Sequence, residues 1–178
     1  DKCDVMIAGV YPTIGRSTSV SFSKAFFYAG NSVVVNTNNN RFKNLEDLNQ
    51  KGVKLAIIQG EFAQAYAKKH LPNAELVILE KSSDLSLPLV AVSSGKADAG
   101  FSTSDVISEY VAKHPELKDL FANDPYAVIP STFAVKHSDQ QLLNFLNNAL
   151  DYLEATGFID ATAQKYNASG WYGIKNSY

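Results

Sequence analysis

The stretch from Lys54 to Leu79, KLAIIQGEFAQAYAKKHLPNAELVIL, decides the fold class. Its first residues, Lys54–Ile58, form a short apolar run that is typical of a buried strand. The next segment, Glu61–His70, places apolar residues at helical spacing, and Pro72 follows its end. A second apolar run, Leu76–Leu79, predicts another strand. A strand, a helix and a strand in this order predict a βαβ unit with parallel strands.

The same alternation of strands and helices extends along the chain in both directions. Asn44 is positioned to cap one short helix, and Ser104 or Thr103 to cap another. Ser138, with Gln141 three residues later, has the spacing of a capping box for the longest helix, and Gly157 ends that helix. These signals predict an α/β fold with a mostly parallel sheet. The further strands expected are Val5–Ala8, Ser32–Val35, Ala97–Phe101 and Thr132–Val135, and the further helices Leu45–Gln50, Asp105–Lys113, about 139–156 and Ile159–Tyr166.

Composition and charge exclude several classes of protein. The 178 residues include 16 basic and 18 acidic ones, which leaves no basic surface for nucleic acid. No apolar run approaches the roughly 18–20 residues that span a bilayer. The single cysteine, Cys3, allows no internal disulfide and no cysteine-based zinc site, and we expect it to fill a small space in the core.

No catalytic motif is present in the sequence. HExxH, GxSxG and GxxxxGK[ST] are all absent, so there is no signal for a zinc protease, a serine hydrolase or a P-loop enzyme. The three histidines each lie near the end of a predicted element, where a solvated role is usual. We therefore expect no catalytic residue, no metal and no cofactor.

Two loops carry candidate binding groups. The loop after the first predicted strand contains Gly9, Tyr11 and Arg16, and an arginine offers a planar fork of donors that matches a carboxylate. The loop Gln59–Phe62 joins a strand to a helix, so the free N–H groups of that helix face the strand's carboxyl end. Ligands of open α/β sheets bind at such ends. Each loop also has an interpretation without a ligand. Arg16 is then an ordinary surface residue, and Glu61 itself occupies the positive end of the helix.

The ordered series of these segments resembles the amino-acid-type solute-binding proteins, which are the extracytoplasmic receptors of ABC importers with the two-lobed type II periplasmic-binding fold. Each segment is a weak signal, but their order and spacing cover nearly the whole chain. The segments that carry the resemblance are Asp4–Arg16, Val20–Ser23, Phe26–Tyr28, Leu45–Leu48, Val53–Gly60, Ala65–Ala67, Gly95–Ala99 and Ala155–Tyr166.

The resemblance implies a set of ligand contacts. Arg16 clamps the ligand's carboxylate, and the backbone of the second loop offers N–H groups to it from the other lobe. Thr103 stands where the family usually has the Asp that binds the ligand's ammonium, and the nearest carboxylate is that of Asp105. Tyr11 and Phe62 also replace smaller hydroxyl residues. The implied ligand-binding residues are Gly9, Tyr11, Arg16, Gln59, Gly60, Glu61, Phe62 and Thr103.

The resemblance also implies an organisation into lobes. Residues 1–36 form part of lobe 1 and the outgoing hinge, residues 37–125 form lobe 2, and residues 126–178 form the returning hinge, lobe 1 helices and a tail. The chain starts just before a predicted strand, so we expect a piece that lacks the N-terminal part of lobe 1. Val5–Ala8 then becomes an exposed apolar edge, open to a strand-exchanged dimer or to a complementing N-terminal segment.

The function expected from the resemblance is capture of a small carboxylate-bearing solute, with an amino acid as the first expectation, by closure of two lobes. The partner is the membrane permease of an ABC transporter. The location is periplasmic or otherwise extracytoplasmic, secreted with a signal peptide in the precursor or anchored as a lipoprotein. Two alternatives stay open: an enzyme like the cyclohexadienyl or arogenate dehydratases, with Glu61 as general acid, and the ligand-binding domain of a sensor.

Overall fold

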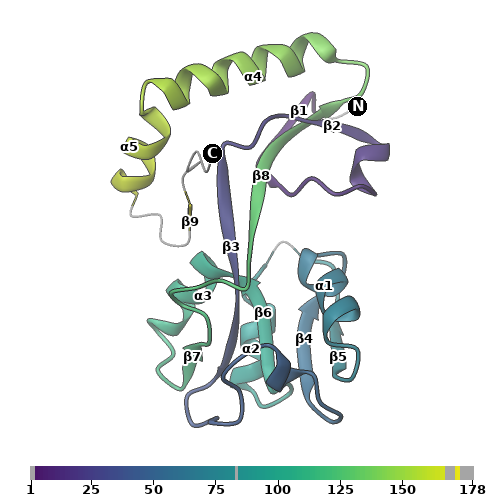
Figure 1. The fold of residues 1–178 in the computed structure, drawn as a ribbon, viewed down its shortest axis with the longest axis vertical. Helices are drawn as coiled ribbons and strands as arrows, with labels where there is room; N and C mark the ends of the chain where they lie inside the picture. Colours follow the sequence, from purple (N-terminus) through teal and green to yellow (C-terminus); the bar gives the residue numbers. More distant parts are fainter. Residues whose placement is uncertain (1–2, 83, 167–170, 173–178) are drawn as a thin grey trace. The chain divides into compact units, whose positions relative to one another are not determined.

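The computed structural model describes residues 3–82, 84–166 and 171–172. The chain divides into two compact units (Figure 1). Unit 2 is the continuous segment of residues 30–127, and unit 1 combines residues 1–29 with residues 128–178. Among the described residues, no helix is long and apolar enough to cross a membrane.

Unit 2 is built on a mixed sheet. Its central strand β4 (Lys54–Ile58) runs parallel to β5 (Glu75–Leu79) on one side and to β6 (Ala99–Thr103) on the other. Beyond β6 lies β3 (Phe27–Asn36), which is antiparallel to β6 and to the short β7 (Leu117–Asp119). The predicted βαβ unit is therefore present and parallel.

The two faces of this sheet carry separate apolar cores. Side chains alternate along a strand, so Val33 and Val35 of β3 enter one core while Val34 enters the other. The first core is covered by α1 (Phe62–His70) and the 3-10 turn η2 (Glu46–Leu48). The second is covered by α2 (Leu87–Ser93) and α3 (Ser104–Val111). A sheet buried on both faces explains the near-continuous apolar runs in its strands.

Unit 1 is built around β8 (Ala127–Lys136), whose first residue belongs to unit 2. The strands β1 (Val5–Val10) and β2 (Val20–Phe22) both pair antiparallel with it. The turn η1 (Arg16–Thr18) lies between them in the chain. The remaining elements are α4 (Gln140–Ala155), α5 (Phe158–Lys165) and β9 (Trp171–Tyr172), which pairs with residues 28–29 of β3.

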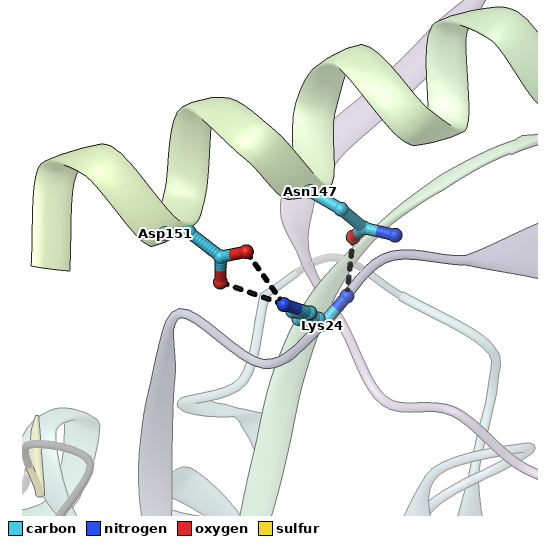
Figure 2. Close-up of polar contacts among 3 residues, drawn as sticks. All are labelled: Lys24, Asn147 and Asp151. Carbon is cyan, nitrogen blue, oxygen red and sulfur yellow. Dashed lines mark hydrogen bonds and ion pairs between the residues drawn. The ribbon is translucent and has the colours of Figure 1, made fainter.

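Lys24 joins the connection between β2 and β3 to the helix α4 (Figure 2). Its ammonium lies 2.6 and 2.7 Å from the two carboxylate oxygens of Asp151, and its backbone N–H donates to Asn147 Oδ1 at 2.8 Å. Both charged side chains are more than half exposed, so the ion pair adds little stability by itself. The three contacts together link α4 to the connection between β2 and β3.

Several sequence predictions need correction. The sheet pairing is mixed and not mostly parallel, because β3 pairs antiparallel with β6, β7 and β9, and β8 pairs antiparallel with β1 and β2. β1 forms as predicted and is the expected apolar edge, since it lies beside β8 at the end of the strand order and its Met6 and Ile7 are exposed. The prediction for Cys3 is wrong, because Cys3 is exposed and fills no space in the core. The cap of α4 is Asp139, which accepts from the Leu142 N–H at 3.0 Å, and not the preceding residue, Ser138.

Candidate functional site

The turn around Arg16 holds a guanidinium in a fixed place. Arg16 is half-buried, and one of its guanidinium nitrogens donates to the Tyr11 carbonyl at 3.0 Å. Its backbone N–H donates to Thr13 Oγ1 at 3.2 Å, and the Ser17 N–H and hydroxyl both donate to the Thr13 carbonyl. None of the described carboxylates forms an ion pair with Arg16. The remaining guanidinium donors are therefore available to an anion.

Gly9 sets the path of the chain into this turn. Its φ of +66° is in the left-handed region, which a side chain would strain. A Cβ there would also lie 3.6 Å from the Phe27 ring and 3.7 Å from Ser131 Oγ. Next to it, the Thr132 hydroxyl donates to the Val10 carbonyl at 2.8 Å. Gly9 at the end of β1 and Tyr11 and Arg16 in the turn after it thus lie in one segment, as the sequence led us to expect.

The loop Gln59–Phe62 uses most of its N–H groups internally. The Gln59 N–H donates to the Leu79 carbonyl, the Gly60 N–H to Gln64 Oε1 at 2.9 Å, and the Glu61 N–H to the Ile58 carbonyl. The Phe62 N–H is the one member of this set with no acceptor among the described residues. Any donation from this loop to a ligand then comes from the first turn of α1, which begins at Phe62.

Phe62 belongs to an aromatic cluster that the sequence did not reveal. Its ring lies 5.8 Å from that of Tyr66 and stacks on Tyr126 with centroids 6.5 Å apart. Tyr66 and Tyr126 are 4.7 Å apart, and the Phe101 and Phe121 rings also pack on Tyr126. Burial, and to a smaller extent the Glu46 carboxylate, raises the pKa of Tyr66 above its ordinary value. The amino-terminal end of α1 therefore begins beside an apolar wall.

Thr103 ends β6 and is the N-cap residue of α3, as one of the two caps expected from the sequence. Its side chain makes no capping bond, and its buried Oγ1 has no hydrogen-bond partner among the described residues. The neighbouring Ser104 is 6% exposed, and its Oγ also has no described partner. Asp105, in the first turn of α3, forms no described ion pair.

The structure therefore gathers the expected residues into two groups. Gly9, Tyr11 and Arg16 lie together in unit 1. In unit 2, the loop Gln59–Phe62 follows β4 and Thr103 ends β6. These strands are parallel neighbours, so both groups lie at the carboxyl edge of that sheet. Among the residues that the structure describes, no cluster of His, Cys, Asp or Glu is suited to hold a metal ion.

Comparison with known proteins identifies relatives along almost the whole chain. The family model for bacterial extracellular solute-binding proteins, family 3, matches residues 1–169. A probable histidine-binding protein of Campylobacter jejuni is 25% identical over 93% of this chain and 62% of its own length. The glutamine-binding protein GlnH of an ABC transporter of Bacillus subtilis is 26% identical over 92% of this chain and 57% of its own. The chain thus spans about three fifths of these curated relatives.

Solved structures agree with this result. An ancestral arginine-binding protein bound to arginine has a TM-score of 0.79 and 30% identity, over 92% of this chain and 71% of that one. The ancestral amino acid-binding protein AncCDT-1, a precursor of cyclohexadienyl dehydratase, has a TM-score of 0.78 and 31% identity, over 92% and 69%. The predicted α/β fold of the two-lobed binding proteins is confirmed, with one lobe represented only in part.

Proposed function

We propose that this chain, which belongs to family 3 of the bacterial extracellular solute-binding proteins, captures a small solute that carries a carboxylate. Relatives named as binding proteins for histidine, glutamine and arginine support a role in solute binding. In this proposal the chain acts outside the cytoplasm, in the periplasm or anchored to the outer face of a membrane. It delivers its solute to the membrane permease of an ABC transporter.

The observation that carries the proposal is the state of Arg16. Arg16 is partly buried and forms no ion pair with a described carboxylate, whereas charges withdrawn from water are normally paired. The hydrogen bond to the Tyr11 carbonyl restrains the side chain before any ligand arrives. A pre-ordered guanidinium can bind a carboxylate through two parallel N–H bonds at a reduced entropic cost.

The second group of residues completes the proposed site. The Phe62 N–H has no acceptor among the described residues and lies at the positive end of α1, so it suits the same carboxylate. The aromatic rings of Phe62 and Tyr66 suit the apolar part of a ligand. We propose that the two lobes, residues 37–125 and the remainder, close on the solute. A ligand stabilises a closed state only as far as it contacts both lobes.

Native mass spectrometry of the complete protein, purified from its host, tests the proposal. The expected result is a bound small acid that is retained by Arg41→Ala but lost from Arg16→Ala. Arg41 is the matched control, because it is exposed and lies 3.9 Å from the Asp98 carboxylate. Equal retention of the acid by both variants contradicts the assignment of Arg16, and a bound solute without a carboxylate contradicts the proposed class.

A dehydratase is the second candidate, favoured by the likeness to the dehydratase precursor AncCDT-1. Glu61, half-buried immediately before α1, is then the general acid. Incubation of the complete protein with prephenate and with arogenate separates the two functions. We expect no product from either compound, whereas turnover that is lost in Glu61→Gln requires the enzymatic assignment.

A further inference from the structure

Thr103 and Ser104 place two unsatisfied hydroxyls at the amino-terminal end of α3. Both Oγ atoms are buried and have no hydrogen-bond partner within the described part of the chain. Their neighbours differ: the Ser102 hydroxyl donates to the Leu85 carbonyl at 2.8 Å, and the Ser32 hydroxyl donates to Asp119 Oδ1. Buried hydroxyls are almost always hydrogen-bonded, because an unpaired one costs free energy. The exception at this edge of the sheet therefore points to a group supplied by a ligand.

The electrostatic setting defines what that group can be. Thr103 is the N-cap of α3 but makes no capping bond, so the first amides of the helix keep their donors. These amides and the helix dipole favour an acceptor over a cation, and the carboxylate of Asp105 in the first turn opposes part of this preference. A carboxylate at position 103 could hold an ammonium group, but a threonine there supplies only a neutral hydroxyl. Asp119, a partly buried acidic residue at the end of β7, already accepts from the Ser32 hydroxyl and from the Phe121 N–H.

We propose that Thr103 and Ser104 form the subsite for the α-substituent of the bound acid, and that this subsite takes a neutral oxygen in preference to an ammonium. The favoured solutes are then 2-hydroxy or 2-oxo acids, and α-amino acids bind more weakly. The inference rests on the proposed capture of a carboxylate-bearing solute and specifies its class. It also gives a reason why a threonine is accepted where the family resemblance expects an aspartate.

Matched pairs of acids test this inference directly. Isothermal titration calorimetry of the complete protein should compare L-lactate with L-alanine, L-3-phenyllactate with L-phenylalanine, and (S)-2-hydroxyglutarate with L-glutamate. Within each pair only the α-substituent changes. In the pair that the protein binds, we expect the hydroxy acid to bind at least about tenfold more tightly than the amino acid. A difference of this size is usual when the polar groups of a site fit one of two ligands and not the other.

Variants at Thr103 test the assignment further, and a variant at Ser102 is the control. Thr103→Asp should reverse the preference by strengthening binding of the amino acid, and Thr103→Val, which keeps the side chain's shape, should weaken binding of the hydroxy acid. Ser102→Ala removes a hydroxyl that already has a partner, so it should leave the preference unchanged. Circular dichroism verifies that each variant is folded.

The outcomes distinguish a failure of the proposed α-substituent subsite from a failure of carboxylate capture. Tighter binding of the amino acid by the unaltered protein overturns this inference but leaves carboxylate capture intact. If Asp105→Asn then abolishes that binding, the ammonium site lies at Asp105. The proposed subsite is also overturned if both Thr103 variants show the same preference between hydroxy acid and amino acid as the unaltered protein. Failure of every acid to bind contradicts the proposed function itself.

Discussion

At the scale of single residues, the carboxyl of Asp119 gives the stability of unit 2 a defined dependence on pH. Burial raises its pKa above the ordinary value, and the hydrogen bonds from Ser32 and Phe121 oppose this shift without cancelling it. The folded chain therefore holds this proton more tightly than the unfolded chain does. The resulting stability is fully present below the ordinary pKa of about 3.9 and is lost as the pH rises through the raised value.

Asp119→Asn should remove this loss, because the amide oxygen still accepts from both donors while the charge is gone. We expect the variant to gain stability over the unaltered protein as the pH increases from about 4 towards neutrality. Urea unfolding at a series of pH values measures the difference. A difference that stays constant over this range would show that Asp119 does not titrate as its surroundings require.

The sequence indicated the charged group of the candidate site, the guanidinium, but not the side chains that surround the site. The spacing after the first strand indicated Arg16 as the anion-binding candidate, and the turn does hold it together with Gly9 and Tyr11. The contact of Phe62 with Tyr126 could not be predicted, because the two rings are far apart in the chain and meet only through the sheet. That the Thr103 hydroxyl has no partner in the described part of the chain was equally hidden, since a sequence does not tell which hydrogen bonds are made.

At the scale of elements, the close approach of α2 to β6 depends on a glycine. A Cβ at Gly100 would lie 2.5 Å from the carbonyl oxygen of Pro88 and 3.1 Å from a methyl group of Val92. The oxygen belongs to the backbone of α2, so the whole helix must move to make room. Gly100→Ala should therefore destabilise the fold by about 1–3 kcal/mol, the usual range for overpacking.

Gly15→Ala is the control for this prediction. Gly15 has an ordinary helical backbone conformation, and no atom lies within 4 Å of a Cβ built there. Its substitution should change the free energy of unfolding by less than about 0.5 kcal/mol, as for most surface sites. Chemical denaturation of both variants gives the comparison, and similar small effects at the two positions would contradict the packing of α2 on Gly100.

Elements were predictable where a local signal was strong. The strand Lys54–Ile58 forms as predicted because its apolar run enters both cores of unit 2. Asn44 makes the hydrogen bond expected of it, since its Oδ1 accepts from the Asp47 N–H at 3.0 Å, but only a 3-10 turn follows and its N-cap residue is Leu45. The strands β2 and β7 have three residues each, too few for any periodicity to reveal. The β6 strand begins two residues later than expected, at Ala99.

At the scale of the whole molecule, the apolar edge of unit 1 predicts association between copies. Within the described part of the chain, β1 pairs only with β8, and Met6 and Ile7 are 51% and 66% exposed. An exposed strand edge with apolar side chains is a template for pairing with another strand. We expect this chain, prepared alone, to form a dimer in sedimentation velocity experiments.

Two lysine variants make the association test specific. Ile7→Lys places a charge on the β1 edge and should shift the chain towards the monomer. Ile14→Lys changes an isoleucine that is 92% exposed but lies outside the strand, and it should leave the association unchanged. A monomer of the unaltered chain at all concentrations, or an equal response to both variants, would rule out pairing through β1.

Carboxylate capture through Arg16 is the central claim, and calorimetry of the Arg16→Ala variant tests it most directly. With the acid identified by mass spectrometry, the complete protein should lose about 2–5 kcal/mol of binding free energy, or about 30-fold to several thousandfold in affinity. Arg16→Lys should recover only part of this, because an ammonium cannot reproduce the two-point contact of a guanidinium. An unchanged affinity in Arg16→Ala would contradict the claim.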